Sequence, residues 1–251
     1  MPPNHKKDFP RIFGIIEVNE SLKSQCTLFK NFEMNLADPD IRNIWEGRET
    51  EFQKLPKEAW DSFKEKIKPY LGSRHTDRGY EQLIATLNEA YTYNYLVLVG
   101  CDRVQFIPES QSQPSPDLQG WLEDQTILCE VKTIQASDNE IQERKKRIRV
   151  STADQKQTLP EEFFNKLEKT INKARDQLDS FNSEAKTKIV FLYLNFDDSW
   201  GKFKNEYFAQ MNIYFSNNPP CGIEVVLHNP KTIFHGKFSA NNVTVINERY
   251  A

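Results

Sequence analysis

Two carboxylates and a lysine near the middle of the chain have the residue types and the spacing of a metal site. Asp117 follows Pro116, residues 118–129 separate it from Glu130, and Lys132 comes two positions after Glu130. Carboxylate oxygens are the ligands that hard divalent cations prefer. Lys132 would place a positive charge beside such an ion. These residues therefore predict a divalent cation held by two carboxylates, with an ammonium group next to it.

A β-hairpin is expected to bring the three side chains together. Side chains of a strand alternate between its two faces, so Glu130 and Lys132 share a face with Leu128. The opposite face is apolar, with Ile127, Cys129 and Val131. A polar turn over residues 123–125 joins this strand to one that Asp117 opens. Residues on neighbouring strands of a hairpin interact, so Asp117 can approach Glu130.

Two amphipathic helices should lie before and after the hairpin in the sequence. Residues 77–94 carry an apolar stripe, with Glu81 on its flank and Glu89 almost opposite, so Glu89 is expected to face water. A longer helix is predicted over residues 159–182. Its expected core stripe is Phe164, Leu167, Ile171, Ala174, Leu178 and Phe181, and one of its flanks carries Lys166, Lys173 and Gln177.

Several apolar runs predict the strands of a sheet. The run Leu96–Cys101 is wholly apolar, as expected of a strand buried on both faces. Further strands are expected over residues 188–194 and 223–227, with edge strands at 232–234 and 243–246. Nearer the start, residues 11–18 suggest a strand and residues 56–71 a helix. The polar segment 138–158, with the basic run Arg144–Arg149, is expected to be a loop or a mobile helix.

Composition limits the classes of protein. The 251 residues carry a formal net charge of only −3, so a surface that binds nucleic acid would have to be locally basic. No apolar run approaches the roughly 20 residues of a membrane span, and the N-terminus lacks the apolar segment of a signal peptide. The cysteines never form a C-x-x-C pair. We therefore expect a protein of the cytoplasm, or of the nucleus in a eukaryote, with no membrane partner.

The order of these features resembles the PD-(D/E)XK nuclease superfamily. Pro116-Asp117 and Glu130-Val131-Lys132 match its motif, and the succession of helix, strands, long helix and strand matches its common core. The resemblance implies an α/β protein with a restriction-endonuclease-like core, in which helices flank a central mixed β-sheet. We expect this nuclease-like domain over residues 76–251. Residues 1–75 would form a mostly helical or irregular extension packed on it.

The resemblance depends more on the surroundings of Glu130 than on the short motif Glu130-Val131-Lys132 itself. Four triplets of the form acidic residue, any residue, lysine occur, at 130–132, 143–145, 154–156 and 184–186. Only the triplet at Glu130 lies in an alternating strand, follows a Pro-Asp at hairpin distance and comes after a helix that carries a carboxylate. Agreement between these independent levels favours it.

The resemblance implies roles for the site residues. Mg²⁺, or Mn²⁺, would be held by Asp117, Glu130 and the backbone carbonyl of Val131, with Glu81 as an outer ligand acting through water. The metal-bound water would attack the phosphodiester. Lys132 would orient or deprotonate that water, or neutralise the charge of the pentacovalent phosphate.

Other residues are expected to bind the substrate. Gln177 and Phe181 resemble the Gln-x-x-x-Tyr element of exonuclease-like branches of the superfamily, although Phe replaces Tyr. The expected substrate contacts are Gln177, Lys173, Lys166, Arg144 and Lys145. The implied enzyme is an endonuclease that acts on DNA, and many such enzymes are homodimers.

Alternatives stay open for both the function and the residues. The chain could be a catalytically silent nucleic-acid-binding member of the same fold, or a nuclease that acts on RNA or branched DNA. Asp117 could simply be a turn residue. Glu130 and Lys132 could form a solvated surface pair, and Gln177 could be a solvated helix residue. A carboxylate such as Glu81 is also favoured at a helix N-terminus for electrostatic reasons.

Overall fold

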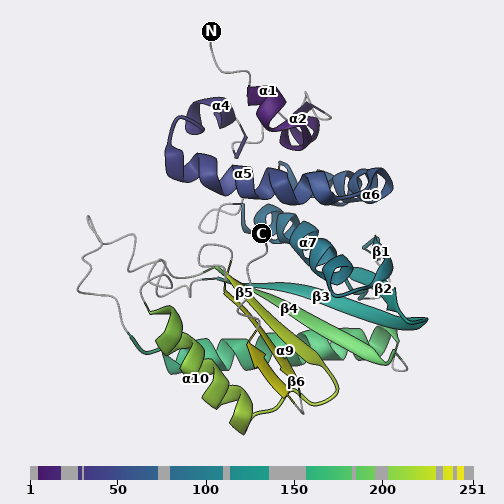
Figure 1. The fold of residues 1–251 in the computed structure, drawn as a ribbon, viewed down its shortest axis with the longest axis vertical. Coiled ribbons are helices and arrows are strands. Elements are labelled where there is room, and N and C mark those ends of the chain that lie inside the picture. Colours follow the sequence, from purple (N-terminus) through teal and green to yellow (C-terminus); the bar gives the residue numbers. More distant parts are fainter. Residues whose placement is uncertain are drawn as a thin grey trace. The chain divides into compact units, whose positions relative to one another are not determined.

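A computed structural model describes most of the chain and divides it into two compact units. The described residues are 5–17, 28–29, 31–72, 80–109, 114–135, 157–182, 185–195, 203–229, 234–239 and 242–245. The first unit spans Met1–Glu109 and the second spans Ser110–Ala251 (Figure 1). The division falls after Glu109, later than the boundary expected after residue 75. Across the described residues, no helix combines the length and the apolar character that a membrane span requires.

The described part of the first unit is mainly helical. Its elements are α1 (His5–Asp8), α2 (Pro10–Glu17), α4 (Phe32–Asn35), α5 (Pro39–Lys54), α6 (Lys57–Ile67), η1 (Lys68–Tyr70), α7 (Glu81–Leu98) and the strand β1 (Asp102–Phe106). Helix α5 begins where the side chain of Asp38 accepts hydrogen bonds from the backbone amides of Asp40 and Ile41, which are otherwise unpaired at a helix start. Ring contacts of Phe52 with Trp60 and Phe63 then join α5 to α6.

Two predicted strands of this unit are helical. Residues 11–18 were expected to be extended, but α2 covers them as far as Glu17. The run Leu96–Cys101 was expected to be a strand buried on both faces, yet α7 continues to Leu98. Val97, Leu98 and Val99 are 49%, 62% and 40% exposed. A short apolar run has no periodicity that separates a strand from the last turn of a helix, and here the preceding helix continues through it.

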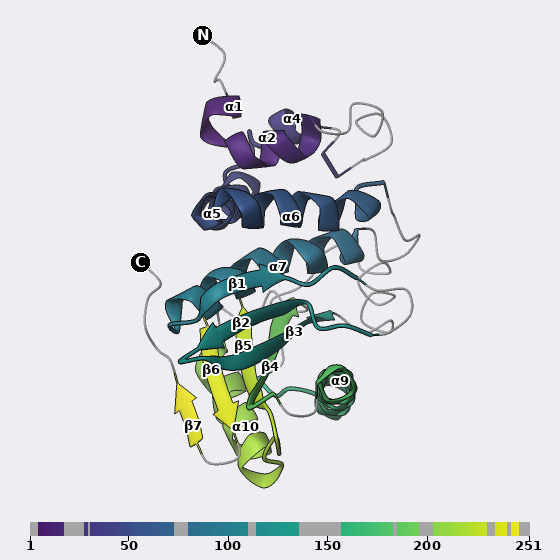
Figure 2. The same ribbon diagram turned by 90° about the vertical axis from the view of Figure 1, so that its right-hand side faces the viewer.

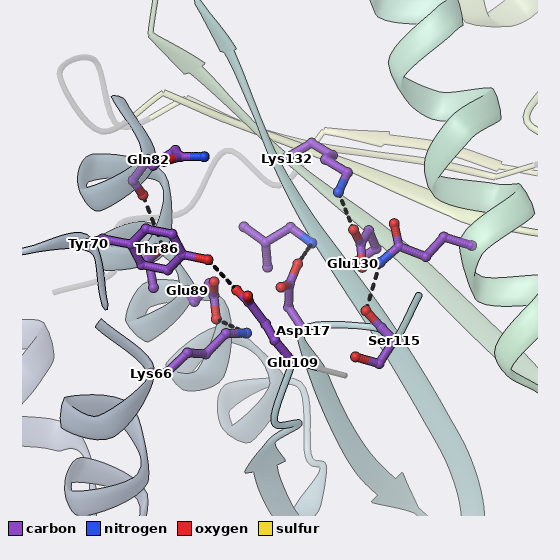
Figure 3. A network of polar contacts seen from close by, with 12 residues as sticks. Lys66, Tyr70, Gln82, Thr86, Glu89, Glu109, Ser115, Asp117, Glu130 and Lys132 are labelled. Carbon is purple, nitrogen blue, oxygen red and sulfur yellow. Dashed lines mark hydrogen bonds and ion pairs between the residues drawn. The ribbon is translucent and has the colours of Figure 1, made fainter. Parts of the chain in front are cut away.

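The prediction that Glu89 faces water is also wrong. Its side chain is buried, and its Oε2 lies 2.6 Å from Nζ of Lys66 on α6 (Figure 3). The apolar stripe marks only part of the buried surface of α7, because Thr86, Asn88 and Thr92 are buried as well. A stripe of apolar residues identifies a core face but cannot show that polar faces of the same helix are also covered.

The second unit is a mixed α/β structure, as expected. Its described elements are β2 (Leu118–Leu122), β3 (Gln125–Gln135), α9 (Glu161–Phe181), β4 (Thr187–Asn195), α10 (Lys204–Asn217), β5 (Glu224–Asn229), β6 (Phe234–Ser239) and β7 (Asn242–Val245). The strands follow the order β2-β3-β4-β5-β6-β7. Strand β3 is antiparallel to β2 and parallel to β4, β5 is parallel to β4, and β6 and β7 complete the sheet in antiparallel pairings.

Helices α9 and α10 share one core with one face of this sheet. Leu167, Ile171, Ala174 and Leu178 of α9 pack there with Leu128 and other strand residues. Figure 2 looks along α9 and shows the helix beside the sheet. The predicted stripe holds except at its ends, because Phe164 is only partly buried and Phe181 is 41% exposed. Helix α10 was not predicted, although Tyr207, Met211 and Phe215 recur every four residues and are buried.

Candidate functional site

A two-residue turn sets the register that places Asp117 beside Glu130. Leu122 pairs with Gln125, and Leu118 pairs with Cys129. Between them, Glu123 and Asp124 both have positive φ, 49° and 63°, as a type I′ turn requires. Continued by one residue, the register sets Asp117 opposite Glu130. The backbone amide of Asp117 donates to the carbonyl of Cys129 over 3.1 Å, which fixes this end of the hairpin.

The carboxylate of Asp117 is held by the backbone of the neighbouring strand. Its Oδ2 accepts a hydrogen bond of 2.8 Å from the amide of Val131, and the residue is half-buried. Val131 follows Glu130 directly, so the amide that fixes Asp117 belongs to the strand that also carries Glu130 (Figure 3). One carboxylate is therefore positioned by the backbone next to the other.

Glu130 is a buried carboxylate with a charged and a neutral donor on its two oxygens. It is 1% exposed. Its Oε1 contacts Nζ of Lys132, and its Oε2 accepts a hydrogen bond of 3.0 Å from Nε2 of Gln177. The side chain of Lys132 remains 30% exposed. A buried charge needs a partner of opposite sign and further hydrogen bonds, and Lys132 and Gln177 supply them.

Gln177 ties the long helix to the hairpin. Besides its bond to Glu130, its Nε2 donates to the carbonyl of Ser115 over 2.7 Å. Ser115 lies two residues before Asp117. One side chain of α9 therefore contacts both Glu130 and the segment that precedes Asp117. The sequence indicated Gln177 as a substrate contact. In the structure it positions Glu130 and the segment that leads to Asp117.

The basic flank of α9 runs along β3. Nζ of Lys166 donates to the carbonyl of Gln135, at the end of β3, over 2.8 Å. Lys166 and Gln177 are eleven residues apart, which corresponds to about 16 Å along the helix. Gln135 and Glu130 are five residues apart, which corresponds to the same length, about 16 Å, along the strand. The two elements therefore run in opposite directions side by side, and the exposed Lys173 lies near the level of Lys132.

Four of the predicted site residues have roles that stay predictions. Glu81 is the first residue of α7 and belongs to the first unit, so its role as an outer ligand stays a prediction. Arg144 and Lys145 lie outside the described residues. The backbone carbonyl of Val131 likewise stays a predicted ligand.

The donor set of the second unit fits a hard divalent cation. Among the described residues, no three His, Cys, Asp or Glu side chains gather into a site for a metal ion. The predicted ligand set is of another kind, with two carboxylates and a backbone carbonyl, all of them oxygen ligands of the type that Mg²⁺ and Mn²⁺ accept. Asp117 and Glu130 with Lys132 leave one net negative charge, which favours a cation.

Sequence reasoning missed the residues that hold the end of α9 on the sheet. Lys188, at the start of β4, is buried, and its Nζ lies 2.6 Å from Oδ1 of Asp179. Strand β4 places Lys188 beside Leu128 of β3, two residues from Glu130. The available signal was a lysine at the head of an otherwise apolar strand, which required a carboxylate partner on the helix before it.

Comparison with known proteins gives no relative. No protein-family model, no curated protein and no solved structure matches this chain.

Proposed function

We propose that this chain is a metal-dependent nuclease of the PD-(D/E)XK type, with a restriction-endonuclease-like core. One observation carries the proposal. A buried carboxylate, Glu130, contacts a partly exposed lysine from its own strand, and the next backbone amide of that strand holds a second carboxylate, Asp117. Metal-assisted hydrolysis of a phosphodiester needs this combination of anionic ligands and a cation that can reach the substrate.

The burial of Glu130 argues against a solvated surface pair. Exposed Lys–Glu pairs contribute little to stability, and both partners lie in water. Here the carboxylate is 1% exposed and its lysine is 30% exposed. Gln177 adds a directed hydrogen bond to the same carboxylate, which a solvated pair would not require. The asymmetry favours a site at which the carboxylate is fixed and the lysine can move.

Each residue of the second unit has a defined task in this proposal. A bound Mg²⁺ would supply a Lewis acid and a water molecule of lowered pKa. Asp117 and Glu130 would bind the ion, and the amides of Val131 and Gln177 hold these two carboxylates in position. Lys132 would donate to a phosphate oxygen or take the proton of the attacking water. Lys173, on the exposed flank of α9, would contact an adjacent phosphate.

The proposed substrate is DNA, cut internally. Arg144 and Lys145 would add phosphate contacts. Such local cationic contacts are needed because the chain as a whole carries a net charge of −3.

A cleavage assay with matched variants tests the proposal. Purified protein is incubated with single-stranded, duplex and branched DNA and with RNA, in Mg²⁺ or in EDTA. Asp117→Ala and Lys132→Ala should abolish Mg²⁺-dependent cleavage. Asp176→Ala and Lys169→Ala, at exposed positions of α9, should not.

Two results would contradict the assignment. Cleavage that survives both Asp117→Ala and Lys132→Ala would remove these residues from the active site. Binding of nucleic acid without cleavage of any substrate would favour a catalytically silent member of the fold. Cleavage of RNA or branched DNA alone would keep the site and change the substrate.

A further inference from the structure

Lys132 contacts an oxygen that the proposed metal site also needs. Its Nζ lies on Oε1 of Glu130, and Glu130 is one of the two carboxylates that would hold the ion. The two residues stand on the same face of β3, two positions apart. The lysine therefore already provides positive charge where a divalent cation would provide it.

Two cations beside one buried carboxylate repel each other. The repulsion is strong in a protein interior, because the surrounding dielectric constant is far below that of water. The side chain of Lys132 is 30% exposed, and its four-carbon stem can carry the ammonium group away from Glu130 into solvent. Gln177 is neutral, so its hydrogen bond to Oε2 does not oppose a cation.

We propose that Lys132 is a resident counter-ion of Glu130, and that binding of a divalent cation displaces it. This inference rests on the proposed function, because it takes Asp117 and Glu130 as ligands. Without metal, the ammonium group of Lys132 compensates the negative charge of the buried Glu130 carboxylate. With metal, its amine is released on the exposed side of the site, where a phosphate would arrive. Metal loading and the availability of the lysine are thereby coupled.

The first test compares metal affinity in two variants that lose the same charge. Free Mn²⁺ is measured by its electron paramagnetic resonance signal during titration of wild type, Lys132→Met and Lys169→Met. Lys132→Met should bind Mn²⁺ about tenfold more tightly, since a nearby like charge is gone. Lys169 is exposed on α9 and belongs neither to the proposed metal ligands nor to the expected substrate contacts, so Lys169→Met should bind as wild type does.

The second test uses the wild-type protein and does not depend on a variant that folds. An amine-reactive ester labels the protein with saturating Mn²⁺, or with K⁺ at matched ionic strength, and the Lys132 peptide is quantified by mass spectrometry. Labelling of Lys132 should become faster in Mn²⁺. Labelling of Lys169, an exposed residue of α9 outside the site, serves as the internal reference and should not change.

The outcomes separate this inference from the proposed nuclease. Unchanged or weaker Mn²⁺ binding by Lys132→Met, or labelling of Lys132 that does not rise with metal, would overturn the displacement even if the enzyme cleaves DNA. Tighter binding by Lys132→Met together with faster labelling would support it, even if no substrate is cleaved and the nuclease proposal fails.

Discussion

Each unit of this protein contains a lysine–glutamate pair with a buried carboxylate, and the two pairs differ in their lysine. In the first unit, Lys66 and Glu89 join α6 to α7, and their side chains are only 6% and 7% exposed. In the second unit, Glu130 is 1% exposed, but Lys132 is 30% exposed. Figure 3 draws both pairs. One pair is closed to solvent, and the other is open on the side of its cation.

Under the proposed function, this difference separates a structural pair from a catalytic one. A closed pair cannot exchange its cation without exposing two buried charges, so its effect is on stability. An open pair can release its lysine into water and accept another cation on the carboxylate. The burial of an acidic residue is therefore weak evidence of function by itself. The exposure of its partner and the presence of a second carboxylate, Asp117, are the informative features.

The largest expected effect is on catalysis at the open pair. Asp117→Asn should lower the rate of Mg²⁺-dependent cleavage by about 10³-fold or more, because a metal ligand contributes several kcal/mol to the transition state. The free energy of unfolding should change by no more than about 1 kcal/mol, since the site is half-buried and the amide has the same shape. Initial rates and urea titrations measure the two quantities. If Asp117→Asn lost much of its free energy of unfolding but still cleaved, Asp117 would have a structural role and not a catalytic one.

At the closed pair the expected effect is on stability. Glu89→Ala leaves Lys66 buried without its counter-ion and should lower the free energy of unfolding by about 3–5 kcal/mol. The double variant Lys66→Met/Glu89→Leu serves as the control and should recover most of that loss, because apolar side chains can fill a buried ion-pair site. Urea denaturation followed by circular dichroism gives the values. A loss below about 1 kcal/mol for Glu89→Ala would show that this pair is effectively solvated.

A smaller effect is expected where Gln177 holds Glu130. Gln177→Met should lower cleavage about 10- to 100-fold, as loss of a group that orients a metal ligand does, and should raise the Mg²⁺ concentration at half-maximal rate. High Mg²⁺ should restore part of the activity. Gln210 provides the matched control, since its side chain contacts Leu159 and Gln157 in the segment before α9. Gln210→Met should lower stability without shifting the Mg²⁺ dependence, and an equal shift in both variants would contradict the positioning role.

The smallest effect concerns alkaline pH near the closed pair. Burial, together with a 2.6 Å hydrogen bond to Glu109, raises the pKa of Tyr70 from 10.0 to about 12. A raised pKa favours the protonated phenol in the folded state, so its contribution to stability is complete below pH 10 and disappears as the pH rises through about 12. Tyr70→Phe should therefore flatten the fall of unfolding free energy over this range. Equal slopes for variant and wild type would contradict the assignment.

The sequence contained enough signal for the hairpin and the long helix. Alternation in residues 127–132 and the polar turn predicted β2 and β3, and β3 with α9 defines the site. The core stripe of α9 follows a 3.6-residue period, which is a property of the sequence alone. The register that sets Asp117 opposite Glu130 also follows from the length of the turn.

The rest depends on contacts between distant residues, which the local pattern does not contain. The burial of Glu89 follows from Lys66, on another helix. The role of Gln177 follows from Ser115 and Glu130, 62 and 47 residues away. The run at Leu96 was ambiguous because six apolar residues fit a buried strand and a helix end equally well.

The contrast between the two pairs assigns Glu130 to the proposed reaction and Glu89 to the fold. It is tested most directly by measuring Mg²⁺-dependent cleavage with Glu130→Gln and Glu89→Gln, under conditions in which circular dichroism shows that both variants are folded. We expect Glu130→Gln to lose activity by about 10³-fold or more, while folded Glu89→Gln cleaves at the wild-type rate. Cleavage by Glu130→Gln at the wild-type rate would contradict it.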